Sequence, residues 1–208
     1  MIDWEMDCSI DEAISAITQA LLSQRIPFYR LEESLERRRK DGSKRPSSVW
    51  SNFDESWIMN PETLPMKRAR IATRDIARAT DKRTVIAALI PPNTIVNSKS
   101  PYLLFTSGTP RDEAFVLGVL SSVTLDWYSR FYVEIHLTKS ILDTFPIPIP
   151  NQEEDIFLRT IEIVGRLAAV DDRYSKWAKE VGVPVGSVKS QSEKEDLIAE
   201  LDAVVAHL

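Results

Sequence analysis

Residues 67–83 carry an unusual density of positive charge for a chain whose formal net charge is −5. The cationic residues of this segment are Lys67, Arg68, Arg70, Arg74, Arg78, Lys82 and Arg83. An arginine can donate two parallel hydrogen bonds to a phosphate or to a guanine edge, which lysine does less well. The segment therefore predicts a surface that contacts nucleic acid. The alternative is that Arg74–Asp75 and Arg78–Asp81 are ion pairs that brace a turn.

A second group of cations precedes this segment and consists of Arg37, Arg38, Arg39, Lys44 and Arg45. Residues 37–83 contain thirteen basic and six acidic residues, whereas residues 1–36 contain two basic and eight acidic ones. Residues 151–208 are also acidic, with seven basic and twelve acidic residues. The sequence pI of about 5.2 argues against a protein that coats nucleic acid, but it is compatible with a local basic face.

The middle of the chain holds side chains of the types that a metal-dependent nuclease uses: Asp126, Glu134, Lys139 and Asp143. Nothing in their spacing selects them as a site, and Asp126 is interpreted as a charge at a helix end. His136 has no orienting partner in the sequence, so we interpret it as a surface or strand histidine and not as a general base. The spacing of these residues predicts no catalytic centre.

The stretch LIPPN at residues 89–93 has the two prolines of an adenine-methyltransferase catalytic loop, but it lacks the loop's other features. Such a loop needs a polar residue before the prolines and an aromatic residue after them to hold a flipped adenine. Ile90 and Asn93 occupy these positions, and the six glycines never form the turn that S-adenosylmethionine requires. The chain also lacks G-x-S-x-G and P-loop motifs. We predict that the prolines end a strand and that this chain is not itself an enzyme.

The composition limits the remaining classes of site and location. Cys8 is the single cysteine, so an intramolecular disulfide is excluded, and only His136 and His207 could join it on a zinc ion. No apolar run approaches the roughly 18 residues of a membrane span. The N-terminus is acidic where a signal peptide would be basic. The sequence thus predicts a cytoplasmic protein without a metal site or a membrane segment.

The first part of the chain alternates helix and loop signals. Ser9 and Glu12 form a capping box, which predicts a helix from Ile10 to Leu21. Residues 25–31 predict a short edge strand, because a proline interrupts an apolar run. A charged helix follows and is expected to end in a flexible loop at residues 41–48, where glycine, serine and proline gather.

The rest of the chain predicts a sheet followed by helices. Strands are expected near residues 66–77, at 84–90 with both faces buried, at 94–97 and at 102–105. Pro110 opens a helix expected to turn six residues towards a core: Phe115, Val116, Val119, Leu120, Val123 and Trp127. Two long helices are expected at 151–180 and 192–208. The predicted class is α+β, a mixed sheet with flanking helices in domain 1–150 and a C-terminal long helix pair in domain 151–208.

Three separated stretches resemble the specificity region of type IIG restriction–methylation enzymes and related phage-defence adenine methylases. RIATRDIARATDKRTVIAALIPPNTIVN (70–97) is similar to a family stretch R-D-I-A-R-x-T-x-x-R-T-x-I-A-A-x-I-P. AFVLGVLSSVTLDWYSRFYV (114–133) is similar to the family's L-L-G-L-L-N-S helix, although Ser121 stands where the family often has asparagine. LTKSILDTFPIPIP (137–150) resembles the L-P-V-P strand that ends target-recognition domains. The order of these stretches also resembles type I restriction specificity subunits.

The resemblance implies a DNA sequence-recognition module, a C-terminal fragment of an N6-adenine DNA methyltransferase of the restriction–modification type. Its implied partners are double-stranded DNA and an N-terminal methyltransferase domain that binds S-adenosylmethionine, with a fused nuclease as an option. The expected DNA contacts are Arg68, Arg70, Arg74, Arg78, Lys82, Arg83, Arg37, Arg38, Arg39, Lys44 and Arg45. Arg74 and Arg78 are also candidates for fold determinants, since the family keeps them across different targets. Base contacts are expected in loops 43–66 or 97–113, and the acidic helices at 152–180 and 192–208 would act as a spacer.

Two other classes of function stay open from the sequence. The chain is alternatively a protein-interaction scaffold within a phage-defence complex, with its cations facing an acidic partner. It is also alternatively an enzyme whose site assembles only in three dimensions, from Asp126, Glu134 and Lys139 with a bound Mg²⁺.

Overall fold

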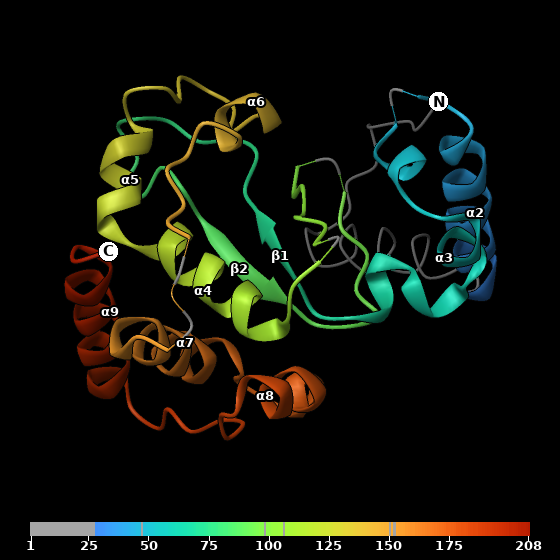
Figure 1. The fold of residues 1–208 in the computed structure, drawn as a ribbon. Coiled ribbons are helices and arrows are strands. Elements are labelled where there is room, and N and C mark those ends of the chain that lie inside the picture. The colour runs from blue at the N-terminus through green and yellow to red at the C-terminus, as the bar shows by residue number, and fades with distance from the viewer. Residues whose placement is uncertain (1–27, 47, 98, 106, 150, 152) are drawn as a thin grey trace, which may run out of the picture. The chain divides into compact units, whose positions relative to one another are not determined.

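The computed structural model describes residues 28–208 apart from residues 47, 98, 106, 150 and 152. This part of the chain is mostly helical and carries a small antiparallel sheet (Figure 1). The α+β class is confirmed in this broad sense. The predicted helix at 10–21 and the start of the predicted strand at 25–31 lie outside the described residues.

The chain divides into two compact units, residues 1–64 and residues 65–208. The elements described in the first unit are α2 (Phe28–Ser43), η1 (Val49–Asn52), α3 (Glu55–Met59) and η2 (Pro61–Thr63). The predicted division at residue 150 separates a recognition domain from a spacer, and this functional division stays a prediction.

Helix α2 corrects two predictions about the first unit. Residues 28–31 are helical and not part of an edge strand. Residues 41–43, expected in a flexible loop, form the last turn of the same helix. Gly42 belongs in this turn for a packing reason, since a Cβ there would lie 2.7 Å from Cδ1 of Trp50.

Three aromatic side chains pack together beside α2. The Phe53 and Trp57 rings stack with centroids 4.1 Å apart, and Trp50 lies 6.4 Å from Trp57. Trp50 lies on η1, Trp57 on α3 and Phe53 in the extended link between these two helices. In the described part of this unit, the side chains of Ile58 and Leu64 are buried.

The sheet of the second unit pairs β1 (Arg70–Thr73) with β2 (Ala87–Ile90) in antiparallel register, with Arg70 opposite Ile90. The predicted mixed sheet is wrong, since these are the two strands present in the described residues. Tyr102 forms only an isolated bridge with Ala72, and residues 94–97 form no strand. Prolines at 91, 92 and 101 remove backbone donors from the segments expected to extend the sheet.

Strand β2 is shorter and less buried than its apolar sequence indicates. Of its four residues only Leu89 is buried, and Ala88 is exposed. Thr84 and Val85 are buried but precede the strand, because their backbone N–H groups donate to the Asp126 carboxylate and not to a neighbouring strand. The apolar run therefore predicts the burial of these residues correctly, but it does not predict which of them pair with a neighbouring strand.

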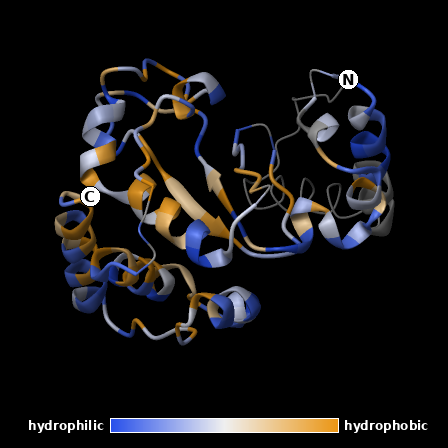
Figure 2. Cartoon of the chain, in the orientation of Figure 1, coloured by the Kyte–Doolittle hydropathy of each residue, from blue (hydrophilic) through white to orange (hydrophobic). Residues whose placement is uncertain are grey.

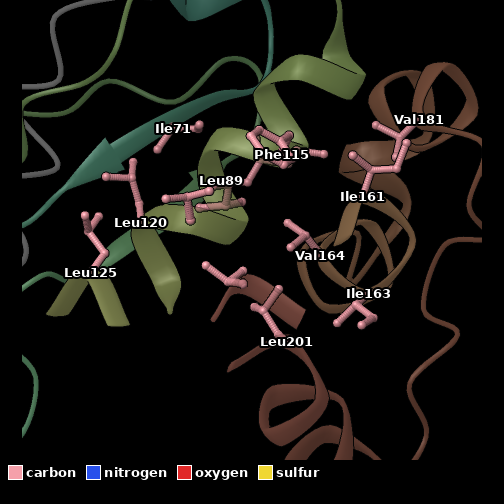
Figure 3. Close-up of a cluster of buried hydrophobic side chains, with 14 of the residues drawn as sticks. Ile71, Leu89, Phe115, Leu120, Leu125, Ile161, Ile163, Val164, Val181 and Leu201 are labelled. Atoms are coloured by element: carbon pink, nitrogen blue, oxygen red, sulfur yellow. The ribbon is translucent and has the colours of Figure 1, made fainter. Parts of the chain in front are cut away.

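Helices cover the sheet and make up most of the second unit. Its remaining elements are η3 (Pro65–Lys67), α4 (Pro110–Ser121), α5 (Val123–Ser129), α6 (Lys139–Leu142), α7 (Asp155–Ala168), η4 (Asp172–Tyr174), α8 (Ser175–Val181) and α9 (Gln191–Val205). Helix α4 packs on the strands, α7 on α4, and α9 on α7 (Figure 1). The buried side chains between them form one apolar cluster, which includes Ile71, Phe115 and Val164 (Figure 3). The hydropathy colours show apolar stripes on these helices with polar stripes beside them (Figure 2).

Helix α4 begins where the sequence predicts, but it ends early. Thr109 caps it and forms a reciprocal capping box with Asp112, with Pro110 in the first turn. Ser122 then breaks the helix with an extended backbone and caps α5 through its hydroxyl. This break turns the helical face that follows, so Val123 and Trp127 are exposed and not directed into the core as predicted.

The predicted helix at 151–180 is three shorter elements, α7, η4 and α8. The break lies at Ala169–Asp171, where the Asp171 side chain accepts the Arg173 backbone N–H and so competes with helical pairing. Gly118 allows α4 to approach α7 closely, because a Cβ there would lie 2.8 Å from Thr160 Cγ2. The final helix, α9, begins one residue before the predicted start at 192, and the Ser190 side chain caps it by accepting the Glu193 backbone N–H.

Among the described residues, no helix has both the length and the apolar character needed to cross a membrane.

Candidate nucleic-acid interface

The turn between β1 and β2, residues 74–86, carries most of the cations of the predicted DNA-binding segment. A buried carboxylate on α5 holds the end of this turn. Asp126 is 2% exposed, and its Oδ1 accepts the backbone N–H of Thr84 at 2.7 Å and of Val85 at 2.9 Å. A carboxylate that accepts two backbone N–H groups in a buried site is a strong and geometrically specific anchor.

Arg130, one turn further along α5, holds the middle of the same turn. Its guanidinium donates to the other Asp126 oxygen, Oδ2, at 2.9 Å. It also donates to the backbone oxygens of Ala79 at 2.7 Å, Asp81 at 3.0 Å and Lys82 at 3.1 Å. The three carbonyls and the carboxylate together fix the path of residues 79–82 against the last turn of α5. We call residues 78–83, held in this way, the clamped turn.

Two of the predicted DNA contacts project from the clamped turn without a side-chain partner in the described part of the chain. Arg78 and Lys82 are both exposed. Their backbone atoms take part in the turn, since the Arg78 oxygen accepts the Thr84 hydroxyl and the Lys82 oxygen accepts Arg130. A fixed backbone with exposed cationic side chains suits contacts to phosphates, which set the position of a protein on DNA without reading its sequence.

Arg74 and Arg83 use their charges within the unit. Arg74 forms an exposed ion pair with Asp81, with Nη2 to Oδ2 at 2.8 Å. This pair differs from the Arg74–Asp75 and Arg78–Asp81 pairs considered from the sequence, although the Arg78 backbone N–H donates to Asp81 at 3.2 Å. Arg83 donates to the Ser121 backbone oxygen and lies 3.9 Å from Asp126. Both arginines therefore brace the turn as well as lining its surface.

Arg68 and Arg70 differ in exposure although they are two residues apart. Arg68 is exposed and donates to the Phe105 backbone oxygen at 3.0 Å. Arg70 is 4% exposed, donates to the Thr94 oxygen at 2.7 Å and lies over the Tyr102 ring. Burial lowers the pKa of Arg70 and raises that of Tyr102. Arg70 therefore holds the sheet to the segment at 94–102, and its burial removes it from the predicted contacts.

The predicted DNA contacts of the first unit also include both exposed and buried side chains. Arg37, Arg38, Lys44 and Arg45 are exposed. Arg39 is 2% exposed and donates to Thr63 Oγ1 at 2.7 Å and to the Asn60 oxygen at 3.0 Å, with its guanidinium 5.4 Å from the Trp57 ring centre. Burial lowers the pKa of Arg39. Arg39 thus anchors α2 to residues 57–63 and cannot reach a phosphate in this conformation.

The side chains considered for catalysis are separated or occupied. Asp126 is buried in the clamp, and Lys139 pairs with Asp143 on α6. In the described residues, no group of three histidine, cysteine or acidic side chains is placed to hold a metal ion.

His136 has an orienting partner that the sequence does not reveal. Its Nδ1 lies 3.2 Å from Asp75 Oδ1, and Lys99 donates to Asp75 Oδ2 at 3.1 Å. The hydrogen bond from Lys99, more than the one from His136, lowers the pKa of Asp75. Segments 75–77 and 135–137 run antiparallel here, which brings the two side chains together. Lys99 and His136 are exposed, Asp75 between them is half-buried, and the cluster braces the turn from its other end.

The proline pair lies directly after β2, as predicted for a strand terminator. Asn93 follows with φ of 57°, and its backbone N–H donates to the Met66 oxygen at 2.6 Å. Asparagine tolerates this left-handed conformation better than most residues.

Sequence reasoning missed the two residues that organise the clamped turn. Arg130 was not singled out, and Asp126 was interpreted as a helix-end charge. Their spacing of four residues, with Asp126 on α5 and Arg130 at its C-terminal cap, is the local signal that could have indicated a pair. Their partners in residues 79–85 lie more than 40 positions away, where no local pattern reaches.

Comparisons of the chain with protein-family models, with curated proteins and with solved structures find no match in any of the three.

Proposed function

We propose that the chain is a DNA sequence-recognition module of a restriction–modification type N6-adenine DNA methyltransferase. In this proposal the second unit is a target-recognition domain, and the catalytic domain with its S-adenosylmethionine belongs to an N-terminal part of the parent polypeptide. The chain itself performs no chemistry. The clamped turn is the observation that carries the proposal, because it presents Arg78 and Lys82 to solvent from a backbone held by Asp126 and Arg130.

A clamped turn suits DNA binding for an energetic reason. Ordering a loop on binding costs conformational entropy, which reduces the affinity obtained from each phosphate contact. Here the backbone of residues 79–82 is already fixed, because three of its oxygens accept hydrogen bonds from Arg130. The Asp126 carboxylate in turn holds Arg130. The cations therefore meet phosphates with only their own side-chain freedom to lose.

The exposed cations of the first unit form a second candidate contact, comprising Arg37, Arg38, Lys44 and Arg45. Arg39 holds the helix that carries the first two of them. Arg68 is exposed and is a third candidate, whereas the exposed Arg74 is paired with Asp81. Arg39 and Arg70 are left out of the proposed contact set because they are buried.

The experiment is duplex-DNA binding by fluorescence anisotropy between low and moderate salt, with the wild-type chain and Arg78→Gln/Lys82→Gln. We expect the logarithm of the binding constant to fall linearly with the logarithm of salt concentration. Loss of two phosphate contacts should reduce that slope by about 1.8, at about 0.9 for each phosphate.

A matched control removes the same charge elsewhere in the unit. Lys176 and Lys179 are exposed on α8, so Lys176→Gln/Lys179→Gln lowers the net charge equally without touching the clamped turn. An unchanged slope for this control would assign the effect to position and not to total charge. Absence of binding by the wild-type chain at low salt would overturn the proposal.

A protein-interaction scaffold is the second candidate function. The observation that favours it is a group of exposed apolar side chains along and after α5, which includes Val123, Trp127, Phe131 and Ile135. Exposed patches of this kind often mark binding surfaces. Weak salt dependence of DNA binding, with no effect of Arg78→Gln/Lys82→Gln, would favour this second function.

A further inference from the structure

Two large aromatic side chains lie exposed at the C-terminal end of α5, Trp127 on the helix and Phe131 in the turn that follows it. Trp127 is 63% exposed and Phe131 is 67% exposed, and their rings meet edge to face with centroids 4.9 Å apart. Val123, four residues before Trp127, is 50% exposed on the same side of the helix. Single exposed apolar residues need no explanation, but a contiguous group with two aromatic rings is unusual and marks a binding surface. We call Trp127 and Phe131 the aromatic pair.

The aromatic pair lies next to the clamped turn. Arg130 stands between its two members in the sequence, and its backbone N–H donates to the Trp127 oxygen. The Arg130 guanidinium also binds the backbone oxygens of Ala79 and Lys82. The Arg130 side chain therefore links the backbone of Lys82 directly to the segment that carries Trp127 and Phe131. Figure 1 shows the chain before β2 passing beside α5.

The neighbouring groups narrow the chemistry of the occupant. Arg78 and Lys82 are exposed cations without a side-chain partner among the described residues, so they favour an anionic occupant. The exposed rings favour an occupant with flat apolar faces. A nucleic-acid strand with unpaired bases supplies both, since phosphates alternate with bases that have lost their stacking neighbours. A fully paired duplex supplies the phosphates but keeps its base faces covered by each other.

We propose that the aromatic pair stacks on an unpaired base of a DNA whose phosphates Arg78 and Lys82 hold. This inference rests on the proposed DNA-binding function and adds a preference for DNA with an unpaired base. Stacking against an aromatic side chain requires no particular base, because every base has a π face. The aromatic pair therefore confers sensitivity to base unpairing, while sequence discrimination falls to other residues.

The test compares two DNA probes that carry the same number of phosphates. One is a fully paired duplex of about 20 base pairs, and the other has the same length with three central mismatches that form a bubble. We expect the wild-type chain to bind the bubble more tightly. Trp127→Ala/Phe131→Ala should lose about 5- to 150-fold in affinity for the bubble, the range measured for loss of base stacking, while keeping its affinity for the paired duplex.

Two further variants make the result specific. Trp127→Phe keeps an aromatic face and should retain most of the bubble preference. Ile149→Ala removes another exposed apolar side chain, 97% exposed, and should change neither affinity. Circular dichroism of each variant checks that the fold is retained, which is expected because the altered side chains are on the surface.

The failures of the two proposals are distinguishable. If the wild-type chain binds neither probe at low salt, the DNA-binding function itself is wrong, and this inference falls with it. Equal wild-type affinities for both probes, or an equal loss on both in Trp127→Ala/Phe131→Ala, would overturn the inference and leave DNA binding standing. Sedimentation velocity tests whether a second copy of the chain, and not DNA, binds the aromatic pair. A wild-type dimer that the double variant abolishes would assign the aromatic pair to self-association and also overturn the inference.

Discussion

The two basic segments of this chain are built on different secondary structure, yet each uses arginine in two ways. In the first unit Arg39 points inward from α2, while its neighbour Arg38 is exposed. In the second unit Arg130 binds the clamped turn from α5, while Arg78 on that turn is exposed. In both units an arginine that donates hydrogen bonds within the unit positions the backbone that displays other cations.

The difference between the units lies in the partners of the inner arginine. Arg39 donates only to neutral oxygens of Asn60 and Thr63 and lies against an aromatic ring. Arg130 donates to three carbonyls and to the buried carboxylate of Asp126. A buried carboxylate adds Coulombic attraction, but it also makes the loss of either partner costly, because the other charge is left uncompensated. We therefore expect the second unit to be more sensitive to single changes.

The largest effect is expected for Asp126→Ala. This change leaves the N–H groups of Thr84 and Val85 without their acceptor and removes the charged partner of Arg130. The free energy of unfolding of the second unit should fall by about 3–5 kcal/mol, the range for breaking a buried pair from one side. Urea unfolding followed by circular dichroism measures the change.

The charge and the hydrogen bonds of Asp126 can be separated with Asp126→Asn. The amide keeps one oxygen to accept the Thr84 and Val85 N–H groups but removes the charge opposite Arg130. A loss clearly smaller than that of Asp126→Ala would assign most of the anchor to the backbone bonds. Equal losses would show that the ion pair dominates.

A smaller effect is expected for Arg39→Ala in the first unit. Its hydrogen bonds to Asn60 and Thr63 and its contact with Trp57 should together contribute about 2–3 kcal/mol. Hydrogen exchange measured by mass spectrometry should show faster exchange of the amides in residues 55–64. Arg38→Ala is the matched control, because the same charge is removed from an exposed position, where changes usually stay within about 0.5 kcal/mol. Unchanged exchange in Arg39→Ala would contradict the anchoring role.

The smallest effect is expected for Arg74→Gln. Arg74 and Asp81 form an ion pair with side chains 42% and 36% exposed, and such pairs contribute at most about 1 kcal/mol. The urea midpoint should therefore shift little, and the shift should shrink further as salt is added. A loss comparable to that of Asp126→Ala would show that the clamped turn depends on its surface pair, which would remove the contrast with the buried anchor.

The features that the sequence by itself determined are those whose interactions span a few residues. Pro110 opens α4 and the proline pair follows the end of β2, both as predicted, and α9 begins one residue before the predicted start at 192. The uneven charge is likewise a property of the sequence alone. These features need no distant partner, because caps and proline geometry act within about four residues of the chain.

Tertiary structure alone decided which charged and aromatic residues face solvent. Asp126 bonds residues 84 and 85 across a separation of more than 40 positions, so its burial follows from packing and not from a local pattern. Ser122 breaks the helix and turns Trp127 outward, although periodicity alone directs that ring to the core. The sequence alone leaves open whether a charged or aromatic side chain faces the core or the solvent. The free energy of long-range contacts selects between them, and that selection separates Arg39 and Arg70 from the cations left for a partner.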